Sequence, residues 1–214
     1  MSSPPFSEVR DVDVTIDGLK CVQELQVRGS SAILTIAADS VTNCNTGAIV
    51  NAANEGCLGG GGIDGRISDL GGATLYEARC ALPLVPGTSA RVLTGDAKAT
   101  IAGDLPCDYV IHAVGPNFCH YESQDKAMGL LENAYKNAML RASEYKLKKV
   151  AFCILSAGIF RGDCSLREII SAGLDSIAQS VYPELERVYF CAFTDLEQQT
   201  VQELTASYSG SGSV

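Results

Sequence analysis

Basic residues, long apolar runs and paired cysteines are scarce in this chain of 214 residues, and each scarcity argues against a class of protein. Only 16 Lys and Arg stand against 25 Asp and Glu, and the net charge of −9 argues against binding of nucleic-acid phosphates. No apolar run approaches the roughly 20 residues that cross a bilayer. We therefore expect neither a nucleic-acid partner nor a membrane partner.

The nine cysteines have no paired spacing of the CxxC type, which argues against a zinc site. Their odd number, the lack of a signal peptide and the length of the chain favour reduced thiols in an intracellular compartment. The cytoplasm or the nucleus is the expected location, with the mitochondrion not excluded. We expect a monomer with no metal and no cofactor.

Strand-like and helix-like segments alternate along most of the chain, which predicts an α/β protein. We expect a three-layer α/β/α sandwich around a central mixed, largely parallel sheet. Residues 20–206 form the expected single domain, after a partly mobile N-terminal extension over 1–19 and before a flexible Ser- and Gly-rich tail over 207–214. Strands are expected at 21–27, 32–38, 48–50, 91–94, 109–114, 150–155 and 188–193. Helices are expected at 63–70, 73–82 and 123–146, and from 165 and 195.

Three helix starts carry capping signals. Ser123 is a candidate N-cap for the long helix, and Ser165 with Glu168 fits a capping box. Residues 195–198 fit a second capping box before the last helix.

The stretch from Val50 to Gly65 is the strongest functional signal, because two asparagines and four consecutive glycines lead to Asp64 at a helix start. Glycines let backbone N–H groups approach a ligand closely, and N–H groups at a helix N-terminus form an anion site suited to phosphate. Residues 115–118 and 156–162 are two further loops after strands, and parallel strands present such loops at one edge of the sheet. The second glycine-bearing loop makes a diphosphate a fitting ligand.

These segments resemble the signature of macrodomains, in the arrangement of the MacroD-type ADP-ribosyl hydrolases. The resemblance rests on Asn-Ala-Ala-Asn at 51–54, the glycine run with Ile-Asp-Gly at 63–65, and the segments 109–116 and 156–160. It covers roughly residues 20–206. It implies an ADP-ribose-binding fold that removes mono-ADP-ribose from acidic side chains of proteins, and that also hydrolyses O-acetyl-ADP-ribose.

The resemblance also assigns roles within the expected site. Asp64 would activate a water against the anomeric carbon of the distal ribose, and Asn54 would hold that ribose through its hydroxyls. Asp39 would accept the adenine amino group, and Phe193 would stack near the adenine. The full set of expected ligand-binding residues is Asp39, Ser40, Asn51, Gly60, Gly61, Gly62, Ile63, Ser156, Ala157, Gly158, Ile159, Phe160 and Phe193.

Two positions depart from the family pattern. Ser68 stands where the family often has a histidine, and Arg161 stands where a glycine is common. A guanidinium at 161 would contact a phosphate or cap the cleft. The zinc-dependent branch carries cysteine and histidine ligands around the first loop, where this chain has glycines.

Simpler interpretations stay open for several residues. Asp64 fits a helix N-terminus on electrostatic grounds alone, and His112 in an apolar strand fits a buried structural histidine. Asn51 would serve either the loop backbone or the ligand, and Phe193 either the core or the cleft. A protein that binds ADP-ribosylated proteins without hydrolysis is the alternative function. A nucleotide-binding oxidoreductase would need a GxGxxG fingerprint directly after a strand, and the glycine run lacks that spacing.

Overall fold

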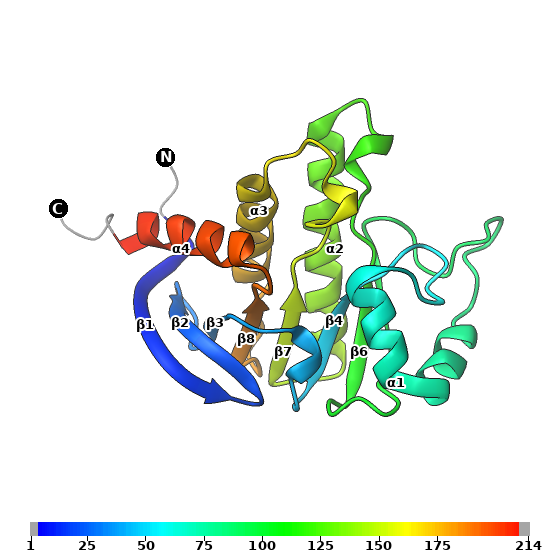
Figure 1. The fold of residues 1–214 in the computed structure, drawn as a ribbon, viewed down its shortest axis with the longest axis horizontal. Coiled ribbons are helices and arrows are strands. Elements are labelled where there is room, and N and C mark those ends of the chain that lie inside the picture. Colours follow the sequence, from blue (N-terminus) through cyan, green and yellow to red (C-terminus); the bar gives the residue numbers. More distant parts are fainter. Residues whose placement is uncertain (1–3, 210–214) are drawn as a thin grey trace.

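The computed structural model describes residues 4–209, which form an eight-stranded sheet covered by helices on both faces (Figure 1). The strands are β1 (Phe6–Ile16), β2 (Leu19–Val27), β3 (Ile33–Ala37), β4 (Ala48–Ala52), β5 (Ala97–Ile101), β6 (Tyr109–Ala113), β7 (Lys149–Cys153) and β8 (Arg187–Cys191). Their order in the sheet is β1-β2-β3-β8-β7-β4-β6-β5. The central run from β3 to β6 is parallel, and β1, β2 and β5 pair antiparallel at the two sides. The expected α/β/α sandwich with a mixed, largely parallel sheet is confirmed.

Four helices complete the layers: α1 (Gly62–Cys80), α2 (Gln124–Glu144), α3 (Leu166–Ala178) and α4 (Asp195–Ser209). α2 and α3 pack side by side on one face of the sheet, and α1 lies on the other (Figure 1). Short 3-10 helices span Val41–Asn43, Phe118–His120 and Ile159–Arg161. No helix in residues 4–209 is long and apolar enough to cross a membrane.

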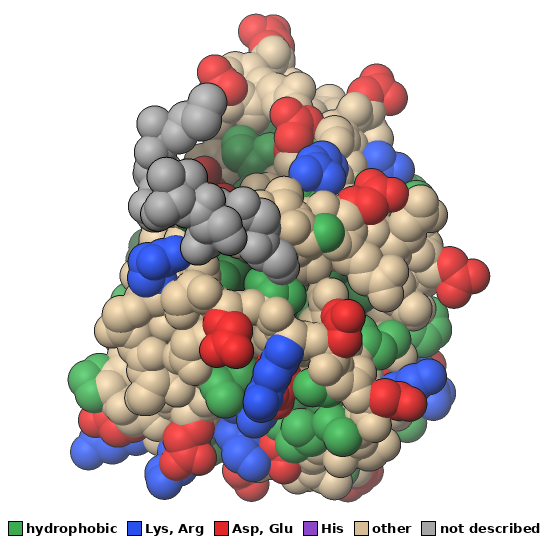
Figure 2. Space-filling model, turned by 90° about the vertical axis from the view of Figure 1, so that its left-hand side faces the viewer, with side chains coloured by type: hydrophobic (Ala, Val, Ile, Leu, Met, Phe, Trp, Pro, Cys, Tyr) green, Lys and Arg blue, Asp and Glu red, His purple; other side chains and the backbone are tan. Residues whose placement is uncertain are grey.

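The N-terminal segment differs from its expectation, because residues 6–16 form the edge strand β1 and are not an extension outside the domain. Phe6 is buried and its ring lies 5.4 Å from the ring of Tyr208 on α4. Acidic and basic side chains are interspersed on the face of the molecule that carries this strand (Figure 2). Such charges oppose pairing of an edge strand with another chain. At the other end, α4 continues to Ser209, and residues 210–214 of the expected tail lie outside the described residues.

The expected strand at 91–94 is wrong, and the antiparallel strand at this side of the sheet is β5. The N–H groups of Arg91 and Val92 donate to the carbonyl of Glu55, and the N–H of Thr94 donates to the Glu55 carboxylate. These N–H groups therefore donate to Glu55 in the loop after β4 and are not available for pairing with a strand of the sheet.

The capping expectations have mixed outcomes. Ser123 caps α2, since its Oγ accepts from the N–H of Lys126. Ser165 precedes α3 but makes no capping hydrogen bond through its side chain, so that capping box is not formed. The box before α4 lies one residue earlier than expected: Thr194 Oγ1 accepts from the N–H of Glu197, whose carboxylate accepts from the N–H of Thr194.

Candidate functional site

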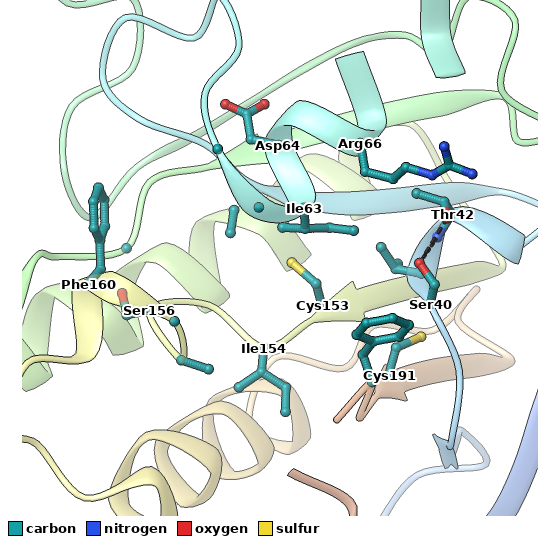
Figure 3. A pocket seen from close by; sticks show the side chains of 18 of the residues that line it. Ser40, Thr42, Ile63, Asp64, Arg66, Cys153, Ile154, Ser156, Phe160 and Cys191 are labelled. Atoms are coloured by element: carbon teal, nitrogen blue, oxygen red, sulfur yellow. Dashed lines mark hydrogen bonds between the residues drawn. The ribbon is translucent and has the colours of Figure 1, made fainter. Parts of the chain in front are cut away.

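A cavity of about 1040 Å³ opens at the carboxyl ends of the parallel strands (Figure 3). This is the edge at which ligands bind in open α/β sheets. The loops after β3, β4, β6, β7 and β8 all contribute to its wall. Its lining consists of residues 39–43, 52–54, 60–64, 66, 115, 153–154, 156–160, 191, 193–194 and 197.

The glycine run from Gly60 to Gly62 forms one wall of the cavity together with the first turn of α1. Gly61 is the N-cap of α1, and Gly62 has a positive φ of 59°. A Cβ on Gly65 would lie 2.7 Å from the carbonyl oxygen of Gly60, so the first turn of α1 is packed against the loop backbone. The first N–H groups of a helix have no partner within the helix. This wall therefore presents backbone donors suited to an anion.

The loop after β7 forms the facing wall and is tied to the loop after β6. Ser156 has a left-handed backbone with φ of 56°, which is a strained conformation for a residue other than glycine. Its Oγ donates to the carbonyl of Pro116 at 2.8 Å, and a Cβ on Gly115 would lie 2.3 Å from that Oγ. Ile159 is 90% exposed at the cavity. The expected binding residues 156–160 thus all line one wall, and its first residue is tied to the loop after β6.

Asp64 lies in the first turn of α1 and is only 3% exposed, yet it lines the cavity. Its Oδ1 accepts from Asn51 Nδ2 at 2.8 Å and pairs with Arg79 Nη2 at 3.0 Å. Its buried Oδ2 has no hydrogen-bond partner among the described residues. A Cβ on Gly60 would lie 3.1 Å from this Oδ2 and 3.1 Å from Asn54 Nδ2. One carboxylate oxygen is thus fixed, and the other is available beside Asn54.

Asn54 lines the cavity while its amide is engaged in its own loop. Nδ2 donates to the carbonyl of Gly59 at 2.9 Å, and Oδ1 accepts from the N–H of Cys57 at 3.1 Å. These bonds hold the amide in a single orientation next to Gly60.

Asn51 does not line the cavity, so the structure does not support its expected contact with a ligand. Its side chain is fully buried, and Nδ2 contacts both Asp64 and Nδ1 of His112, the latter at 3.2 Å. His112 is also fully buried; burial first, and then the charge of Arg79, hold its pKa well below the usual range. The structural interpretation of His112 is therefore the correct one.

At the far end of the cavity, Asp39 and Ser40 lie as expected, but their polar atoms have protein partners. Asp39 accepts from the N–H groups of Lys20 and Ser40, at 3.0 and 2.8 Å, and from Asn43 Nδ2 at 2.8 Å. Phe193 is 69% exposed and lines the cavity, so it belongs to the cleft and not to the core. The carboxylate of Glu197 accepts from the Phe193 N–H at 2.9 Å and fixes the backbone below the ring.

Two arginines differ from the expected site: Arg66 lines the cavity, and Arg161 does not. Arg66 is the one basic residue of the cavity lining (Figure 3). Arg161 does not line the cavity, since its Nη1 donates to the carbonyl of Cys164 at 2.9 Å. Arg66 directly follows Gly65 of the motif, so its place in the cavity lining could have been expected from the sequence.

Cys153 and Cys191 lie at the base of the cavity, where β7 and β8 end (Figure 3). Burial raises the pKa of the Cys153 thiol to about 12, and it raises the pKa of Cys191 well above the usual range. Both side chains therefore stay protonated at neutral pH and contribute apolar surface. In residues 4–209, no group of three or more His, Cys, Asp and Glu side chains is placed to hold a metal ion.

Comparison with known proteins identifies the family. Residues 50–168 match the family described as Macro domain. A macro domain-containing protein of Cupriavidus necator is 36% identical over 170 residues, which cover 79% of this chain and 95% of that protein. An O-acetyl-ADP-ribose deacetylase of Enterobacter sp. (strain 638) is 34% identical over 171 residues, which cover 80% of this chain and 92% of that protein. The chain belongs to the macrodomain family.

A solved structure supports the same assignment. The Oceanobacillus iheyensis macrodomain with ADP superposes with a TM-score of 0.73 at 26% identity, covering 94% of this chain and 100% of that chain. The expected resemblance and the expected fold are both confirmed.

Proposed function

We propose that this macrodomain binds ADP-ribose in the cavity, removes mono-ADP-ribose from acidic side chains of proteins and hydrolyses O-acetyl-ADP-ribose. The observation that carries the proposal is Asp64 Oδ2, a buried carboxylate oxygen without a hydrogen-bond partner at the wall of a cavity sized for a nucleotide. The Enterobacter relative named for deacetylation of O-acetyl-ADP-ribose and the solved neighbour with ADP support the choice of ligand.

In the proposed complex, the diphosphate lies between the N-terminus of α1 and residues 156–160. Backbone N–H groups and the helix dipole favour an anion at that place. The adenosine then extends toward Asp39, Ser40 and Phe193, which line the same cavity. The distal ribose extends the other way, toward Asn54 and Asp64.

Asp64 acts as the general base in the proposed reaction on the protein-linked ester. A water oxygen forms a bond to the anomeric carbon, and the bond from that carbon to the carboxyl oxygen breaks. The electron pair leaves with the protein carboxylate, and Asp64 Oδ2 takes the water proton. A carboxylate is a good leaving group, so this step does not require a second catalytic acid. Hydrolysis of O-acetyl-ADP-ribose also breaks an ester bond with water, and it yields ADP-ribose and acetate.

The test is release of ADP-ribose from a protein mono-ADP-ribosylated on glutamate, and of acetate from O-acetyl-ADP-ribose. Asp64→Asn keeps the shape of the side chain and should reduce both rates by about 10²- to 10³-fold, with the affinity for ADP-ribose retained in calorimetry. Asp69→Asn changes an exposed carboxylate on the same helix and should leave both rates unchanged. Tight binding of ADP-ribose without release by the wild type would make the protein a reader of the modification.

A further inference from the structure

Arg79 is fully buried and its guanidinium contacts the carboxylate of Asp64. Its Nη2 is 3.0 Å from Asp64 Oδ1, its Nη1 donates to Ser68 Oγ at 2.8 Å, and its side chain is 1% exposed. A break between helices was expected at residues 71–72, but this contact across the break was not. Residues 64 and 79 would be about 22 Å apart along an unbroken helix, at 1.5 Å per residue.

A break in α1 brings the two residues together. Gly72 interrupts the helix with φ of 64° and ψ of −161°, a region of backbone conformation that is essentially restricted to glycine. After this break the second part of the helix changes direction (Figure 1), and Arg79 lies against the first turn. A Cβ on Gly103 would lie 2.1 Å from the carbonyl oxygen of Gly71, so the neighbouring loop holds the break in place.

Small side chains leave room for the guanidinium. Ser68 accepts from Arg79 and itself donates to the Asp64 carbonyl at 2.8 Å, so it links the two ends of the pair. A Cβ on Gly59 would lie 3.1 Å from Ser68 Oγ and 3.8 Å from Arg79 Nη1. The guanidinium thus lies in a closed space beneath the glycine loop.

We infer that Arg79 is a positioning residue for Asp64, which holds the carboxylate through Oδ1 and leaves Oδ2 directed to the cavity. This inference rests on the proposed function. Asn51 donates a hydrogen bond to Oδ1, and Arg79 Nη2 forms an ion pair with the same oxygen without a hydrogen bond, so both favour the rotation in which Oδ2 is left without a partner. Arg79 also balances the charge, because a buried carboxylate without a cation takes up a proton or moves toward water. Either change would remove the base.

The kinetic test compares Arg79→Met, which keeps the length and apolar volume of the side chain, with Arg79→Lys, which keeps the charge. We expect Arg79→Met to lower kcat by about 10²-fold with KM and the Kd of ADP-ribose within about twofold, since Arg79 does not line the cavity. Arg79→Lys should recover part of kcat, because an ammonium can pair with Asp64 but cannot replace the guanidinium at Ser68 as well. A residue that serves folding alone would lower the melting temperature when replaced but leave the kcat of the folded enzyme unchanged. Arg141→Met removes an ion pair with Glu144 on α2, away from the site, and should leave kcat unchanged.

Thermal unfolding provides a second readout that does not need activity. If Arg79 balances Asp64, Asp64→Asn/Arg79→Met should unfold at a higher temperature than Arg79→Met alone, because the unpaired buried carboxylate is gone. Unchanged kcat in Arg79→Met, or additive shifts of the melting temperature in the double variant, would overturn the inference. If the wild type binds ADP-ribose but does not hydrolyse the ester, the proposed function fails. The melting temperatures then still test whether Arg79 balances the charge of Asp64.

Discussion

His112 Nδ1 lies 3.2 Å from Asn51 Nδ2, and this contact fixes the protonation state of the histidine. An amide nitrogen only donates, so Nδ1 must be the acceptor. The reverse orientation of the Asn51 amide would place its oxygen against the Asp64 carboxylate. His112 Nε2 then carries the hydrogen and donates to Thr100 Oγ1 at 2.9 Å. The neutral ring therefore supports Asn51, which in turn holds Asp64.

This neutral His112 predicts a loss of stability in mild acid. Its pKa is lowered in the folded state, whereas the unfolded chain takes up the proton near pH 6.5. Below that pH the unfolded state binds one more proton than the native state, so the free energy of unfolding falls, by about 1 kcal/mol between pH 6.5 and 5.5. Urea unfolding at pH 7.5, 6.5 and 5.5 measures this change.

The matched variants are His112→Gln, which removes the buried ring, and His120→Gln, which removes an exposed one. The decline over this range should vanish in the first and persist in the second. Equal declines in the two variants would show that His112 is not the group responsible.

The glycine loop was predictable from the sequence because the residues that define it are close together along the chain. A run of glycines, two asparagines and one aspartate lie within 15 positions, and strand order brings the loop to the correct edge of the sheet. Arg79 was not predictable, because its approach to Asp64 depends on the backbone angles of Gly72 and on packing against Gly103. The edge strand β1 was missed for a related reason: charged residues on an exposed edge strand interrupt the apolar pattern that marks strands. At 91–94, hydrogen bonds to Glu55 overrode the local preference for a strand.

Gly60→Ala should lower turnover with little loss of stability. The added Cβ would lie 3.1 Å from both Asp64 Oδ2 and Asn54 Nδ2, so both side chains must shift by a few tenths of an ångström. Displacements of this size at reacting groups reduce kcat, and we expect a loss of about tenfold or more. Gly129→Ala on α2 is the matched control, because a Cβ there meets nothing within 4 Å and the residue does not line the cavity. Equal kcat values in the two variants would contradict this account of the loop.

Arg66→Gln should weaken binding of ADP-ribose, because Arg66 is the one basic side chain lining the cavity. Its exposure limits the effect, and we expect a rise in Kd of about three- to tenfold that shrinks at high salt. Calorimetry at 50 mM and 500 mM NaCl measures both values. Arg161→Gln should leave Kd unchanged, since that guanidinium binds the carbonyl of Cys164 outside the cavity. A larger effect at Arg161 than at Arg66 would reverse the assignment.

Phe193→Ala separates binding of the adenine from folding. The ring is 69% exposed and lines the cavity, so its removal should leave the melting temperature nearly unchanged. Loss of stacking on the adenine should raise the Kd of ADP-ribose about tenfold. Ribose 5-phosphate has no adenine, so its affinity should not respond to the substitution. Tyr76→Ala, at a 54% exposed aromatic residue of α1 that does not line the cavity, is the matched control and should change neither affinity. If Phe193→Ala weakens both ligands equally, the ring shapes the cavity as a whole and does not contact the adenine.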